Sequence, residues 1–160
     1  MVDTEMKEDK IVRQPQDDPM FLINKESNTV IPLKHASFTV DINLGYSSIV
    51  LHQIYENERD HALETLFMMP YAENFFLSHI EVDFRLEDGT TKTLKTIVTE
   101  REIAQVKYNE AVATGKTAVL SYMQDTRQSK NMLRVMLGNF PARSKALLRA
   151  YCVQQLEFED

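Results

Sequence analysis

Cysteine, glycine and tryptophan are scarce in this sequence, and each scarcity excludes a kind of site. The 160 residues include one cysteine, Cys152, four glycines and no tryptophan. A single cysteine forms no internal disulfide and no cysteine-based metal site. Four separated glycines form no phosphate-binding loop, and no Gly-x-Ser-x-Gly nucleophile motif occurs. The four histidines have no metal-binding spacing, so we expect no metal, no cofactor and no effect of chelators on the fold.

Basic charge and long apolar runs are lacking as well. The net charge is −6 and no run of five Lys or Arg residues exists, which disfavours nucleic acid and anionic membranes as partners. The uncharged stretch Asn43–Tyr55 is far shorter than a membrane span, and the first residues lack the apolar core of a signal peptide. We therefore expect a cytoplasmic protein with no membrane insertion and no nucleic-acid partner.

The first 24 residues differ in composition from the rest, so we divide the chain into an arm, 1–24, and a domain, 25–158. Positions 1–18 hold six acidic and three basic side chains and few apolar ones, too few to offset the entropy of ordering. The arm is predicted to be either a flexible tail or a segment that orders on a partner. Its candidate apolar anchor is Met20, Phe21, Leu22 and Ile23. Deleting 1–24 is then expected to leave the melting temperature almost unchanged.

Beyond residue 30 the apolar residues alternate as in β-strands. In the segment 37–44, Phe38, Val40, Ile42 and Leu44 are predicted to share one face. The segment 77–94 repeats the pattern around the turn sequence "EDGT", which predicts a hairpin. Five further short apolar runs raise the total to seven to nine strands. A pattern of this kind is typical of an antiparallel sandwich or barrel. Strands and helices do not alternate along the sequence, so a parallel sheet is not expected.

One segment has helical periodicity instead, over about residues 100–114. Thr99 and Glu102 have the spacing of a capping box, in which each side chain covers a backbone N–H at the start of the helix. Gly115 stands where a left-handed residue ends a helix. Ala104 and Ala111 would let the helix approach a sheet closely, with Tyr108 between them. The spacing therefore predicts a helix that covers the sheet, possessing no group suited to act as a nucleophile.

The helix and the strand after it, "AQVKYNEAVATGKTAVL", resemble the signature of the vault protein inter-alpha-trypsin (VIT) domain family. Three more segments resemble the family in the same order: "IPLKHASFTVDI", "QIYENERDHALETLFMMP" and "VMLGNFPA". The likeness spans about Ile31 to Val153. Two sequences depart from the pattern, "FMMP" and "FPAR". The motif residues, expected to be structural, are Thr99, Glu102, Ala104, Tyr108, Ala111, Gly115, Ala118, Leu120, Gly138, Asn139 and Pro141.

The resemblance implies a mainly β, antiparallel sandwich-like domain with one packed α-helix and no enzymatic activity. It implies a protein–protein interaction or scaffold module, either a component of a larger assembly or the N-terminal part of a protein that also carries a von Willebrand A domain. The absence of a signal sequence favours the intracellular branch of the family. The alternative is a small-molecule-binding or enzymatic β domain whose site the sequence does not reveal.

Overall fold

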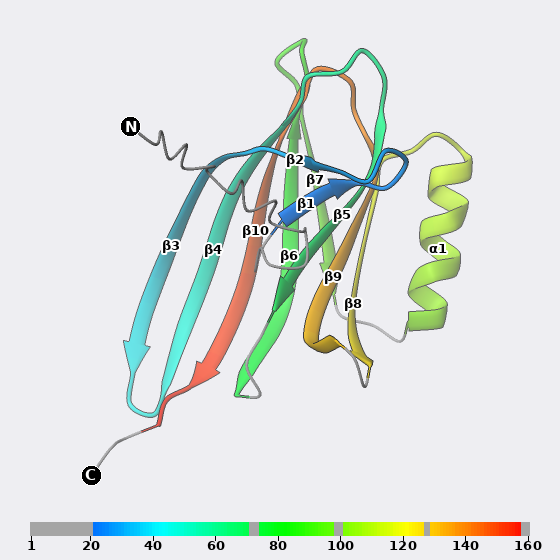
Figure 1. Ribbon diagram of the computed structural model, residues 1–160. Coiled ribbons are helices and arrows are strands. Elements are labelled where there is room, and N and C mark those ends of the chain that lie inside the picture. The colour runs from blue at the N-terminus through cyan, green and yellow to red at the C-terminus, as the bar shows by residue number, and fades with distance from the viewer. Residues whose placement is uncertain (1–20, 71–73, 98–100, 127–128, 158–160) are drawn as a thin grey trace, which may run out of the picture.

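The computed structural model describes residues 21–70, 74–97, 101–126 and 129–157, and these form two five-stranded antiparallel sheets and one helix (Figure 1). Sheet A has the order β2 (Thr29–Ile31), β1 (Phe21–Asn24), β5 (Leu63–Pro70), β9 (Ser129–Phe140), β8 (Ala118–Thr126). Sheet B has the order β3 (Leu33–Asn43), β4 (Tyr46–Asn57), β10 (Ser144–Gln155), β6 (Phe75–Arg85), β7 (Thr91–Ile97). Helix α1 (Arg101–Ala113) lies beside β8. The predicted β-sandwich with one packed helix is confirmed.

The main core fills the space between the two sheets. Alternating residues of β6, including Ile80, Val82 and Phe84, are fully buried there, as their period-two pattern predicts. The ring of Phe84 meets that of Phe140 from β9 edge to face, with centroids 5.5 Å apart. Such a contact adds roughly 0.5–1.5 kcal/mol to the effect of burial alone. This layer joins the two sheets into one sandwich.

Sheet A is buried on both faces, because α1 packs on the side that turns away from sheet B. Leu66 of β5, Leu120 of β8 and Met136 of β9 face Tyr108 of the helix in a second apolar cluster. Successive buried residues of β9 therefore face opposite sides of sheet A. Leu137 belongs to the core between the sheets, and Met136 belongs to the cluster under the helix. Burial on both faces explains the nearly continuous apolar sequence of this strand, which a strand with one wet face does not have.

The structure corrects the boundary predicted at residue 24. Phe21–Asn24 form β1, which pairs with β5 on one side and β2 on the other. Phe21 and Leu22 are buried and Ile23 is half-buried against the helix cluster. An anchor for a partner would have to be exposed, so the docking role predicted for Phe21, Leu22 and Ile23 is wrong. Met20 and the remainder of the predicted arm lie outside the described residues.

The structure also changes the picture of β3. Phe38, Val40 and Ile42 pair with Leu51, Ile49 and Ser47 of β4, so they share the face that points toward the core, as predicted. They are nevertheless 57%, 49% and 74% exposed, because no strand of sheet A covers this part of sheet B. In Figure 1, β1 and β2 lie toward the upper end of sheet B, and the lower parts of β3 and β4 extend beyond them. Leu44 lies past the strand end and is 97% exposed.

Candidate functional site

The seam between α1 and sheet A is centred on the hydroxyl of Tyr108. This hydroxyl donates a hydrogen bond of 2.9 Å to Glu64 Oε2, and the backbone N–H of Asn139 donates one of 2.7 Å to Glu64 Oε1. Burial, and then the nearby carboxylate, raise the pKa of Tyr108 far above its usual range. The tyrosine therefore stays protonated and acts as a fixed donor. Glu64 thus links the helix to β5 and β9 at once.

Gly138 allows this close approach. A Cβ at position 138 would lie 2.5 Å from the hydroxyl oxygen of Tyr108 and 2.6 Å from a methyl carbon of Val112. Real Cβ atoms do not come so near to another side chain, so any larger residue would push the helix away from β9. Ala118 is buried in the same cluster, and Ala111 packs against it. These small residues set the distance between helix and sheet.

Asn139 fastens the C-terminal end of the helix. Its side-chain amide donates hydrogen bonds to the carbonyls of Val112 at 3.3 Å and Lys116 at 3.0 Å. The backbone N–H groups of Gly115 and Lys116 donate to Val112 and Ala111. That pair of bonds is the Schellman arrangement, which satisfies carbonyls that a helix end leaves without partners.

Gly115→Val is expected to destabilise the protein through its backbone alone. Gly115 has a φ of +73°, and a Cβ there would meet no atom within 4 Å. The cost is therefore the strain of a β-branched residue in the left-handed region, at least roughly 1–2 kcal/mol. Urea unfolding should show a lower midpoint for Gly115→Val and a smaller loss for Gly115→Asn, since asparagine tolerates this conformation better. Equal midpoints for Gly115→Val and the wild type would contradict this role.

A second asparagine holds the turn that contains Pro141. The side-chain amide of Asn57 donates to the carbonyls of Phe140 at 3.1 Å and Pro141 at 2.9 Å, and the hydroxyl of Ser144 donates to Pro141 at 2.7 Å. Asn57 is buried. Of the predicted motif residues, Tyr108, Ala111, Ala118, Leu120, Gly138 and Asn139 meet at the seam, Gly115 ends the helix and Pro141 lies in this turn. Thr99 lies outside the described residues, as do the side chains of Glu102 and Ala104.

The polar groups of the seam bind one another. A polar cluster lies on the face of sheet B that turns away from sheet A, and it consists of Glu81, Asp83, Lys95, Arg149, Tyr151 and His79. The Arg149 guanidinium lies 2.8 Å from Asp83 and 3.4 Å from Glu81, and the Tyr151 hydroxyl donates to Glu81 at 3.2 Å. Burial acts to raise the pKa of Glu81, but the hydrogen bonds from Tyr151 and Lys95 and the charges of Lys95 and Arg149 outweigh it and hold that pKa below its usual range. The cluster crosslinks β6, β7 and β10.

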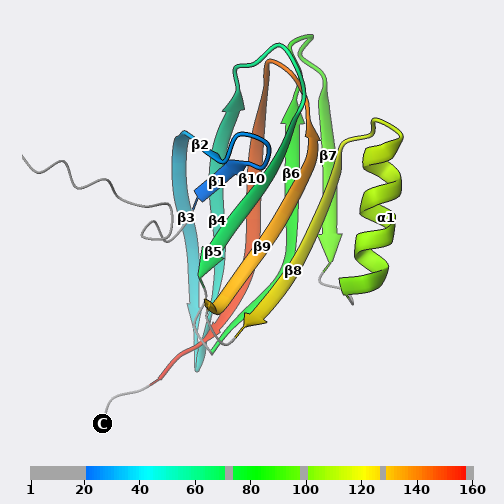
Figure 2. The ribbon, with the colours of Figure 1, turned by 45° about the vertical axis from the view of Figure 1, so that its right-hand side comes forward.

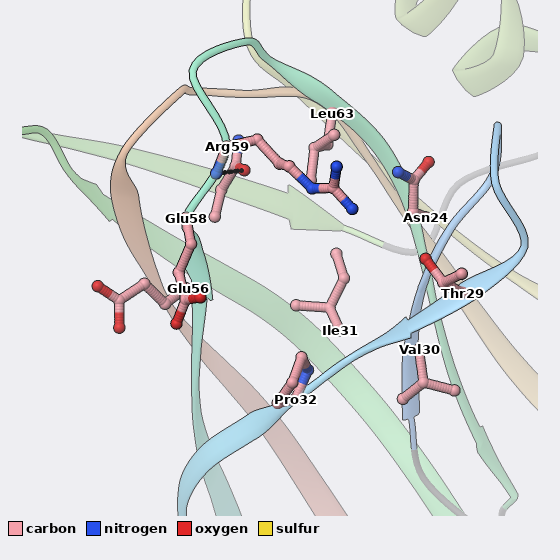
Figure 3. Close-up of a pocket in the computed structure, with 10 residues that line it drawn as sticks. Asn24, Thr29, Val30, Ile31, Pro32, Glu56, Glu58, Arg59 and Leu63 are labelled. Carbon is pink, nitrogen blue, oxygen red and sulfur yellow. Dashed lines mark hydrogen bonds between the residues drawn. The ribbon is translucent and has the colours of Figure 1, made fainter.

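A small cavity lies where the chain passes from β2 to β3, at the other end of β3 from Phe38, Val40 and Ile42 (Figure 3). Its volume is about 180 Å³, below the range of roughly 300–1,000 Å³ typical of ligand pockets. In Figure 3 the guanidinium of Arg59 points toward Asn24, whereas Glu56 and Glu58 point away from it. Lys34 pairs with Glu58 at 2.7 Å at the rim. The cavity has mixed polarity and no convergent set of polar groups.

Cys152 is unsuited to nucleophilic chemistry. It is buried in the inter-sheet core on β10, and burial raises the pKa of its thiol to about 12. A thiol at that pKa is protonated at neutral pH and therefore unreactive. Within the described ranges, no three histidine, cysteine, aspartate or glutamate residues lie close enough to hold a metal ion. In the same part of the chain, no helix has the length and apolar character needed to cross a membrane.

The most unusual surface is the uncovered apolar face of β3, made by Phe38, Val40 and Ile42 and called the β3 face below. Exposed apolar residues that stand singly are normal, whereas several side by side on one strand are uncommon on a monomeric soluble protein. The segment Ala36–Val40 of this strand contains no charged residue, proline or glycine. The alternation of apolar residues in this strand predicted that the three side chains share one face. It carried no signal that sheet A would leave this face open.

The two-sheet sandwich with one helix packed on sheet A defines a small, mainly β domain. The family model of the "Vault protein inter-alpha-trypsin domain" matches residues 33–150, and the chain belongs to that family. The resemblance noted in the sequence is thereby confirmed. No solved structure matches the chain.

Curated relatives carry the same region within much longer proteins. The chain is 25% identical over 132 residues to a von Willebrand factor A domain-containing protein of Dictyostelium discoideum, covering 82% of the chain and 13% of the relative. It is 29% identical over 136 residues to von Willebrand factor A domain-containing protein 5A of Rattus norvegicus, covering 85% and 15%. The human protein of that name is 28% identical over 129 residues, covering 81% and 16%. The chain thus spans a small part of each relative.

Two features of the site were not among the predicted site residues. Glu64 occurs in a family-like segment, but its partners are far away in sequence, 44 residues to Tyr108 and 75 to Asn139. Its position one residue after a buried leucine, within an apolar strand, was the available signal. The β3 face depends on the length of β1 and β2, and no residue of β3 itself encodes that length.

Proposed function

We propose that this protein is a non-enzymatic protein–protein interaction module, working as a component of a larger assembly or as part of a longer protein with a von Willebrand A domain. The observation that carries the proposal is the β3 face. Phe38 and Ile42, at 57% and 74% exposure, present apolar surface to solvent on a strand whose cross-strand neighbours are core residues. Exposed apolar patches of this kind are typical of sites where a partner protein binds and removes the side chains from water.

Two other observations support the proposal. Burial of Cys152, with its raised pKa, leaves no reactive thiol, and the polar cluster around Glu81 is neutralised by its own members on an open sheet face. The relatives are named as von Willebrand factor A domain-containing proteins, so in them this region is joined to other parts. A role inside the cytoplasm, expected from the sequence, stays a prediction.

Site-specific crosslinking tests the proposal directly. A photoreactive benzoylphenylalanine is placed at Phe38, and the matched control carries it at Phe76, an equally exposed phenylalanine on the opposite face of sheet B. Irradiation in cells should give discrete protein adducts from position 38 and not from position 76. The double variant Phe38→Ser with Ile42→Ser should keep the wild-type melting temperature, since both side chains are exposed, but lose those partners in affinity capture. Adducts of equal strength from both positions would contradict the proposal.

A further inference from the structure

The β3 strand offers an open edge as well as an open face. Sheets A and B have four edge strands in the described part of the chain: β2, β3, β7 and β8. The edges β7 and β8 lie against each other, with Thr96 and Ser121 3.4 Å apart across the sheets, and α1 packs beside β8. β2 has only three residues. β3 has eleven, and among the described residues no helix or strand lies beyond it in Figure 2.

Long apolar edges are normally protected, and most of β3 is not. Proteins protect such edges with charges, prolines or bulges, because an unpaired row of N–H and C=O groups recruits another strand. In β3 the bulge between Leu33 and His35 and the ion pair of Lys34 with Glu58 lie at one end. The part from Ala36 to Ile42 pairs regularly with β4 and contains one charge, Asp41. It is therefore ready to accept a partner strand.

The sequence of β3 fits a second copy of itself. When two copies of β3 lie antiparallel with the regular stretch His35–Asp41 overlapped, residue i faces residue 76 − i, and Phe38 lies on the two-fold axis. Val40 then faces Ala36, and the two Phe38 rings face each other. On the other side of the strand, Asp41 faces His35 twice, so a carboxylate acceptor meets an imidazole donor. The register centred on Phe38 thus gives complementary pairs from His35 to Asp41, and beyond them Ile42 faces Lys34.

We infer that the protein forms a two-fold symmetric homodimer by antiparallel pairing of β3 with β3 of a second copy, which joins the two B sheets into one ten-stranded sheet. This inference rests on the proposed function and names its partner. A two-fold interface must be self-complementary, since the same patch serves both subunits. The pairs that surround Phe38 meet that condition. The added strand supplies backbone hydrogen bonds, and the apolar pairs supply specificity.

Sedimentation of the full chain tests the dimer. The wild type is expected to sediment with twice the 18.5 kDa mass of the chain at about 100 µM. Phe38→Lys puts two ammonium groups opposite each other at the axis and should give the monomer mass, while its circular dichroism spectrum should stay that of the folded protein. Phe76→Lys adds the same charge on the opposite face of sheet B and should remain dimeric. A wild type that is monomeric at all concentrations, or a dimer that survives Phe38→Lys, would overturn the inference.

Charge exchange tests the register. His35→Asp places two carboxylates opposite each other at two points and should weaken the dimer about tenfold or more, whereas adding Asp41→His restores the complementary pairs and the dimer. Under mild oxidation, Phe38→Cys should form an intermolecular disulfide in high yield and Phe76→Cys should not. A double exchange that fails to restore dimerisation would overturn the register. A dimer lost on removal of residues 1–20 would show that the N-terminal segment makes the contact, and would also overturn the inference.

The dimer and the proposed function can fail separately. If the wild type is monomeric while Phe38→Lys abolishes capture of other proteins, the dimer is overturned and the interaction module stands. If Phe38→Lys abolishes the dimer while photocrosslinking from position 38 in cells gives only adducts with the protein itself, the dimer is supported and docking on other proteins through this face is overturned.

Discussion

Deleting residues 1–24 should unfold the protein or lower its melting temperature by about 10 °C or more, whereas deleting 1–20 should leave a folded core. The longer deletion removes β1, whose Leu22 is fully buried between β2 and β5. Burial of a leucine or phenylalanine side chain contributes roughly 1.5–3 kcal/mol, and Phe21 is buried as well. The deletion also uncovers the edge of β5 and separates β2 from sheet A.

A loss of about 5 kcal/mol corresponds to roughly 10–20 °C for a domain of this size. Thermal unfolding followed by circular dichroism, with the two truncations side by side, measures the difference. Leu22→Ala in the full chain is the matched point variant and should lose about 2–5 kcal/mol, the range for large-to-small changes in a core. If the 1–24 deletion melts like the wild type, β1 is dispensable and the boundary predicted from the sequence was right.

Tyr108→Ala should destabilise the protein by about 3–5 kcal/mol, the range for truncating a buried aromatic side chain. The ring of Tyr108 is 6% exposed and fills the cluster between α1 and sheet A. Its loss leaves a cavity against Leu66 and Met136 and also removes the donor that Glu64 accepts. A carboxylate that loses a hydrogen bond in such a place is left poorly solvated, which adds to the cost.

Tyr108→Phe separates the two effects. It keeps the ring and removes only the hydroxyl, so the expected loss is about 1.5–3 kcal/mol, the worth of a hydrogen bond to a charged group. The double variant Tyr108→Phe with Glu64→Gln should lose less than the sum of the single changes, because both remove one interaction. Urea unfolding measures all four proteins. Wild-type midpoints for Tyr108→Ala would show that the helix does not depend on this ring.

The sequence was sufficient for the features that depend on local periodicity. The alternation around Ile80, Val82 and Phe84 predicted an inward face, and the turn "EDGT" predicted the hairpin between β6 and β7, which the register confirms. The helix predicted at about 100–114 is found at Arg101–Ala113. Each of these features depends only on residues that are close together in the sequence.

The features that were missed depend on distant parts of the chain. "FLIN" is a short segment, and its burial as β1 depends on β5, more than 40 residues later. The apolar face of β3 was predicted correctly as a face, but whether a face is covered depends on the extent of the opposite sheet. The contact of Glu64 with Asn139 joins two strands that are neighbours only in the finished sheet. No local pattern contains such information.

The strand order of sheet B also bears on how the chain can fold during synthesis. β10 lies between β4 and β6, with registers such as Ala146 to Tyr55 and to Phe84, although it is the last strand in sequence. Pairings of such long sequence separation form slowly, because a large loop must close before any contact is gained. During synthesis, β4 and β6 therefore cannot join through β10 until Ser144–Gln155 has left the ribosomal exit tunnel. In a nascent chain halted before residue 144, β4 and β6 would lack this neighbour, so we expect such a chain to aggregate more readily than the complete domain.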